Sequence, residues 1–129
     1  MTADEESALA FLLLQGIALG RIAIGVVATL APSAVARFQF GSASAAQVLT
    51  IRMLGVRDLG LGLGALIAAR HDNAALRDWA QAGALADAVD AMAFASSGRR
   101  AGVRASRLAT LIAAASAASS TWATRQLPG

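Results

Sequence analysis

The chain contains no cysteine, no lysine and no tyrosine, and these absences narrow the classes of protein it can belong to. Without cysteine, the chain can form neither disulfide bonds nor thiolate metal sites. All 11 basic side chains are arginines, which together with the abundant alanine indicates a GC-rich bacterial genome. Aromatic residues make up only 5% of the chain, so few rings could stack on bases. Nucleic-acid binding is therefore disfavoured, despite a sequence pI of about 11.3.

Charge is also scarce, because Asp, Glu, Lys and Arg together make up 15% of the residues. An ordinary soluble domain is about 25% charged. Apolar residues make up 57% of the chain, and a soluble domain of 129 residues would need a more polar outside. The composition therefore favours a membrane protein, with residues 1–129 forming a single domain.

Four apolar segments are each close to the length needed to cross a membrane, about 20 helical residues for about 30 Å of hydrocarbon. Such segments must be helical, because an open strand would leave backbone groups unpaired in lipid. Proline is rare, and Pro32 ends the first segment. The sequence thus predicts an all-α, integral membrane four-helix bundle, with spans at residues 8–31, 51–69, 79–96 and 104–124.

The arginines near the span ends predict an orientation in the bacterial inner membrane. Positively charged loops face the cytoplasm, which would place the first and third connectors there and both termini outside. Trp79 and Trp122 would then lie on the outer side, in an aromatic belt. The arginines compared are Arg37, Arg52, Arg99, Arg100, Arg104 and Arg107 on one side, and Arg70, Arg77 and Arg125 on the other.

The connectors and the acidic start of the chain carry further expectations. The first connector, residues 32–50, contains Phe38 and Phe40, and we expect a short helix there with both rings at headgroup depth. Residues 70–73 and 97–102 form the other two connectors. The acidic start, residues 4–6, is unlike the positive start of a signal peptide, so the first segment is expected to be a permanent helix.

Five charged residues lie near the middle of three spans, where ionisable groups are costly and usually face a functional or tightly packed interior. The third span shows the problem best. Its large apolar residues contribute roughly −1 to −2.5 kcal/mol to insertion, whereas its two aspartates cost roughly 5 to 7 kcal/mol. This helix needs partners, and helical spacing can gather the charges into one interior cluster: Arg21, Arg57, Asp58, Asp87 and Asp90.

Two interpretations of this cluster remain open. The charges could be ion pairs that lock the helices in register, in which case Asp87→Ala should damage assembly by leaving a buried arginine unpaired. Alternatively, they could form a site for a ligand, a proton or a substrate. Asp87 and Asp90 resemble a metal-binding Asp-x-x-Asp pair, but no further carboxylate or histidine accompanies them, so no metal site is predicted. No catalytic residue and no cofactor can be assigned.

Small residues predict where the helices approach one another. Gly60 and Gly64 share a face with Arg57, and Gly16 and Gly20 form a second small-xxx-small pattern in the first span. Such patterns allow close backbone approach between membrane helices. We therefore expect helix contacts at these two faces.

The pair Gly20-Arg21, the run 52–60 (RMLGVRDLG) and the run 87–90 (DAVD) resemble a family of small bacterial four-span membrane proteins of unknown function. The wider arrangement is similar to DoxX-like four-helix membrane proteins. The resemblance covers residues 15–120, and the Arg-Asp run of the second span is its most specific part. It implies a four-helix membrane bundle and no particular activity.

Three functions are compatible with these features. The favoured one is an accessory or scaffold membrane protein that contacts lipids and assembles as a homo-oligomer or in a larger membrane complex. The second is a protein or enzyme that binds a lipophilic molecule and uses Asp87 or Asp90 as acid or base. The third is proton- or solute-coupled transport, which suits acids at the midplane.

Overall fold

A computed structural model describes residues 2–101 and 104–127, except for the side chains of residues 97–109. These residues form five α-helices and no strand, so the predicted all-α fold is confirmed for the part of the chain described. The helices are α1 (Ala3–Leu30), α2 (Pro32–Phe40), α3 (Ala45–Ala68), α4 (Asn73–Ala101) and α5 (Arg104–Gln126).

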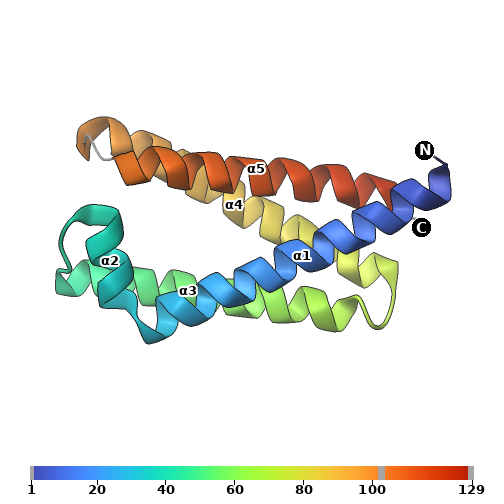
Figure 1. Cartoon of the computed structure of the whole chain (residues 1–129), viewed down its shortest axis with the longest axis horizontal. Helices are drawn as coiled ribbons and strands as arrows, with labels where there is room; N and C mark the ends of the chain where they lie inside the picture. The colour runs from blue at the N-terminus through green and yellow to red at the C-terminus, as the bar shows by residue number, and fades with distance from the viewer. Residues whose placement is uncertain (1, 102–103, 128–129) are drawn as a thin grey trace.

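The four long helices run alternately up and down the molecule (Figure 1). Helix α1 packs along α3, and α4 packs along α5; the two pairs meet where α1 contacts α5 and α3 contacts α4. The start of α1 and the end of α5 lie at one end of the molecule, with the α3–α4 connector. Helix α2, the end of α4 and the start of α5 lie at the other end, which we call the α2 end.

Local sequence explains where the helices begin and end. Thr2 and Ser44 each begin a helix with a capping box, in which the side chain at the third helical position bonds back to the cap backbone. Pro32 starts α2 at a position where its missing N–H is not needed. Gly41 ends α2 with a φ of 73°, a left-handed conformation that glycine adopts without strain.

The predicted spans each fall on a helix, but their limits differ from the helix bounds. Helix α2 confirms the short helix expected in the first connector, and the turn between α3 and α4 confirms the connector at residues 70–73. The connector predicted at residues 97–102 is wrong in its extent, because α4 continues through Ala101. Polar residues ended the predicted span, although they do not prevent a helix from continuing.

The interior is built from small residues, and large apolar side chains cover the outside. The buried cores contain mainly alanine, with Leu14, Ile51 and Leu76 among the few larger members. By contrast, Leu30 and Leu85 are 79% and 68% exposed. Soluble proteins usually bury such large apolar side chains. In this molecule the buried apolar residues are mostly small, and many of the large ones are exposed.

Three glycines carry the close packing between α1 and α3. A Cβ atom on Gly25, Gly55 or Gly62 would lie within 3.0 Å of atoms of the facing helix. Within the chain, the contacts predicted at Gly16, Gly20 and Gly60 do not form, because a Cβ atom there would meet nothing within 4 Å; Gly64 faces the Trp79 ring. Spacing alone could not distinguish these glycines, since the chain has 12.

We expect Gly62→Ala to destabilise the protein and Gly60→Ala to stabilise it slightly. A Cβ atom at Gly62 would lie 2.6 Å from the Ala18 carbonyl oxygen, whereas the position at Gly60 is open. Overpacking costs ~1–3 kcal/mol, of which the better helix propensity of alanine recovers at most ~1 kcal/mol. Thermal unfolding of both variants checks this, and equal melting temperatures would contradict the packing described for α1 and α3.

By length and composition, α1 is the one helix among the described residues that could cross a membrane unaided. The same property is found in core helices of soluble proteins and in signal sequences. Helices α3 and α4 carry Arg57, Asp58, Asp87 and Asp90 near their middles. The four-span membrane arrangement therefore stays a prediction.

Candidate functional site: a row of alternating charges beside a cavity

The five charged residues singled out in the sequence lie together in one hydrogen-bonded row. The row contains one residue from α1, two from α3 and two from α4, so it ties three of the long helices to one another. Its charges alternate in sign, and no two carboxylates are neighbours in it. In order, the row is Asp87, Arg21, Asp58, Arg57 and Asp90.

Arg21 is the most deeply buried cation of the row, with 9% of the residue exposed. Its Nη2 atom donates to Asp87 Oδ2 at 2.6 Å and to the Gly83 carbonyl oxygen at 2.9 Å. Its Nη1 atom donates to Asp58 Oδ1 at 3.2 Å. A planar, delocalised guanidinium group suits such pairing in a low-dielectric interior. Through these bonds Arg21 links α1 to both α3 and α4.

Arg57 forms the other half of the row and is more accessible, with 32% of its side chain exposed. Nη1 and Nη2 donate to the two Asp90 oxygens at 3.0 and 2.7 Å, in the bidentate geometry that makes arginine–carboxylate pairs strong. Nη2 also donates to Asp58 Oδ1 at 3.1 Å. Asp58 Oδ1 therefore accepts from both arginines and joins the two halves.

Helical spacing and close packing explain how the row assembles. Asp87 and Asp90 are three residues apart and project from one side of α4. On α3, Gly62 lies one turn beyond Asp58, and the Arg21 Cβ atom would be 3.2 Å from a Cβ atom at Gly62. The close approach of α1 and α3 at Gly62 thus brings the Arg21 side chain beside Asp58.

Two further residues contribute to this site, and neither was among the five residues predicted for it. Gly83 accepts a hydrogen bond from Arg21, and a Cβ atom at Gly83 would lie 3.0 Å from Arg21 Nη2, so the glycine makes room for the guanidinium. Its position one turn before Asp87 was a usable signal. Ser116 of α5 lines the cavity together with Asp87. No sequence pattern links this serine to α4.

A cavity of about 390 Å³ reaches the charged row from the α2 end of the molecule. All five helices line it, and apart from Gln39 and Ser116 its other lining residues are apolar or glycine. Its volume falls within the range of roughly 300–1,000 Å³ typical of small-molecule sites. The apolar part of the lining includes Ile17, Ile24, Ile51, Leu54, Phe94 and Ile112, and the polar end is formed by the five residues of the row.

The other half of the interior is filled. Beyond Arg21, toward the termini, Leu14 and Leu76 are 3% and 1% exposed and pack in one core with Ala10, Ala18 and Ala80. The pocket lined by Leu14, Ala65 and Leu76 within this core has a volume of only about 20 Å³. The charged row therefore separates a packed half of the molecule from a hollow half.

The lining of the cavity has unused hydrogen-bonding capacity. Two arginines and three aspartates give the row a formal charge of −1. Within the described part of the chain, Arg57 Nε and Gln39 Oε1 are buried and have no hydrogen-bond partner. Unsatisfied buried polar atoms are rare in native proteins and often mark a missing ion, water or ligand.

The row has no arrangement typical of a metal centre. No group of three or more His, Cys, Asp or Glu side chains that could hold a metal ion occurs in residues 2–96 and 110–127. Asp87 and Asp90 are instead paired with different arginines.

Comparison with protein-family models, with curated proteins and with solved structures finds no match to this chain.

Proposed function

We propose that the chain is a four-helix bundle in a bacterial inner membrane, and that its cavity binds a small lipophilic molecule with a hydrogen-bond-donating polar end. The observation that carries this proposal is the apolar cavity of about 390 Å³ that reaches Asp87 and Asp90. The family resemblance carried by residues 52–60 is consistent with the membrane location.

The exposure of large apolar side chains and the burial of charged ones support a membrane location. Large apolar side chains such as Leu12, Leu30 and Leu111 are more than 60% exposed, while Arg21 and Asp87 are buried. In lipid, the exposed side chains would be in a favourable solvent and the charges would be shielded by their partners. Ion pairing also lowers the free-energy cost of inserting α4 into a membrane, because its two aspartates are bonded to arginines of α1 and α3. The α2 end would face the cytoplasm.

The charge of the row favours a particular ligand chemistry. A row with a formal charge of −1 disfavours an anionic head such as a fatty-acid carboxylate. Asp58 Oδ2 has no hydrogen-bond partner among the described residues, and Asp58 lines the cavity. A hydroxyl or amine could donate to a carboxylate oxygen there, while the hydrocarbon part of the ligand would contact the apolar walls.

The test is to purify the protein in a mild detergent, reconstitute it in lipid nanodiscs and measure melting temperature with added ligands. The probes are 1-decanol, decylamine and decanoate, which share a chain length and differ in polar end. A ligand at 100 times its Kd stabilises by ~2.7 kcal/mol, so we expect the alcohol or the amine to raise the melting temperature and decanoate to have no effect. An equal response to all three probes would refute the proposed specificity.

A scaffold role is the second candidate, and the row itself favours it. Arg21 is bonded to Asp58 of α3 and Asp87 of α4, and Arg57 of α3 is bonded to Asp90 of α4. These bonds between helices would fix the register of a structural protein without any ligand. Mass measurement of the detergent-solubilised protein distinguishes this role. A stable oligomer or partner complex with an empty cavity would support it.

Transport has less support, because the filled half offers no continuous path through a single chain.

A further inference from the structure

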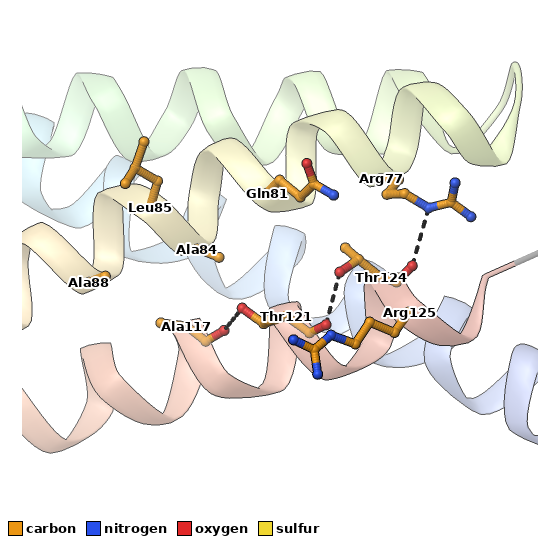
Figure 2. Close-up of a pocket in the computed structure, with 9 residues that line it drawn as sticks. All are labelled: Arg77, Gln81, Ala84, Leu85, Ala88, Ala117, Thr121, Thr124 and Arg125. Atoms are coloured by element: carbon orange, nitrogen blue, oxygen red, sulfur yellow. Dashed lines mark hydrogen bonds between the residues drawn. The ribbon is translucent and has the colours of Figure 1, made fainter. Parts of the chain in front are cut away.

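A second hollow lies between α4 and α5 in the half of the molecule that contains the termini. Its volume is about 570 Å³, and it is separate from the cavity beside the charged row. Figure 2 shows that its lining comes from these two helices alone. The residues of this groove are Arg77, Gln81, Ala84, Leu85, Ala88, Ala117, Thr121, Thr124 and Arg125.

The groove carries positive charge at one end, and its lining contains no carboxylate. Arg77 Nε and Nη2 donate to the backbone oxygens of Thr124 and Leu127 at 3.2 and 2.6 Å, which fixes Arg77 beside the end of α5. Arg125 is exposed and makes no hydrogen bond or ion pair within the described part of the chain. Two guanidinium groups beside one hollow favour an anionic ligand.

The two threonines at this end limit the hydrogen bonds that a ligand could make. The Thr121 hydroxyl donates to the Ala117 carbonyl oxygen at 2.8 Å, and the Thr124 hydroxyl donates to the Thr121 carbonyl oxygen at 2.9 Å (Figure 2). Each hydroxyl proton is therefore engaged within α5, while the oxygen can still accept a hydrogen bond. A fitting ligand has hydroxyl donors as well as an anionic group.

The rest of the groove is apolar and runs along the helices toward the middle of the molecule. Ala84, Ala88 and Ala117 present only methyl groups, and Leu85 is 68% exposed. Trp79 and Trp122 are each 40% exposed, and they are close in sequence to Arg77 and Arg125, respectively. Tryptophan is enriched at the membrane–water boundary, which would place the arginines at headgroup depth and the alanines at acyl-chain depth.

We propose that this groove binds an acidic glycerophospholipid whose headgroup carries hydroxyl groups, as in phosphatidylglycerol. Arg125 contacts the phosphate, a threonine oxygen accepts from a headgroup hydroxyl, and an acyl chain lies along Ala84, Ala88 and Ala117. The inference rests on the membrane location given under the proposed function. It does not rest on the ligand of the cavity beside the charged row, since the two hollows share no residue.

The experiment measures lipid retention by native mass spectrometry after exchange into equal amounts of phosphatidylglycerol and phosphatidylcholine. The variants are Arg125→Gln, the groove-filling Ala88→Phe, and the control Arg70→Gln, an exposed arginine at the same end that does not line the groove. A hydrogen bond to a charged group contributes ~1.5–3 kcal/mol, so Arg125→Gln should reduce phosphatidylglycerol retention by about tenfold or more.

Each outcome decides something about the groove. Loss of retention in Arg125→Gln and Ala88→Phe, with Arg70→Gln unchanged, supports the lipid site. Unchanged retention in both groove variants, or no preference between the lipids, overturns it. Glycerol 1-phosphate is added in a separate arm, and binding as strong as that of the lipid would assign the groove to a soluble phosphate instead. A protein that fails to enter the membrane fraction would contradict the membrane location, which is a separate result.

Discussion

Replacing Asp87 by alanine is expected to lower the free energy of unfolding by about 3–5 kcal/mol, because it breaks a buried ion pair by removing only one of its partners. Asp87 is 7% exposed and accepts from Arg21 at 2.6 Å. Arg21 would keep Asp58 and the Gly83 carbonyl oxygen as partners, but the ion pair that joins α4 to α1 would be lost. Thermal unfolding in detergent measures the effect.

Three further variants make the result specific to the buried pair. Asp78→Ala is the matched control, because Asp78 is exposed on the same helix and should change stability little. Asp90→Ala should have a smaller effect than Asp87→Ala, since the Arg57 side chain is 32% exposed and can be solvated. The double variant Arg21→Met with Asp87→Leu should recover much of the loss, because it leaves no unpaired charge. Wild-type stability in Asp87→Ala would contradict the pairing described.

Filling the cavity with a tryptophan at Ala113 is expected to abolish ligand binding with little loss of stability. Ala113 lines the cavity on α5 and is not part of the charged row. The ring would occupy space that the ligand needs, and an existing void accommodates added atoms better than a packed core. The melting-temperature rise caused by 1-decanol or decylamine should therefore disappear.

The matched control for this variant is Ala114→Trp, which adds the same ring to the next residue of α5. Ala114 is exposed and lines neither hollow, so its response to the probes should equal that of the unmodified protein. If Ala113→Trp also kept the full response, the ligand would bind elsewhere and the proposed site would be wrong. If both variants lost it, the effect would come from the helix and not from the cavity.

Much of the helix order and the composition of the charged row follow from the sequence. Charges near the middle of apolar segments are rare enough to stand out, and the three-residue spacing of Asp87 and Asp90 places them on one helix face. The order of pairing did not follow, because it depends on which helices are neighbours. Arg21 lies between Asp58 and Asp87 as a result of the contacts of α1 with α3, which spacing within α1 does not encode.

The cavity and the close-packing glycines could not be predicted from the sequence for a related reason. A void forms where the side chains of several helices fail to fill the space between them, so no single segment carries its signature. Gly55 and Gly62 are separated by Gly60, which has the same residue type and an open environment. Only the rotation of α3 about its axis distinguishes them, and that rotation is set by the neighbouring helices.

The contrast between the filled half and the hollow half has a mechanical consequence. Leu14, Ala18, Leu76 and Ala80 pack in one core that holds the α1–α3 pair and the α4–α5 pair together near the termini. We expect a small rotation of one helix pair relative to the other to displace the helices little near the termini and more at the α2 end, where the cavity lies. A ligand of variable width could therefore be admitted at the α2 end without disturbing the packed half.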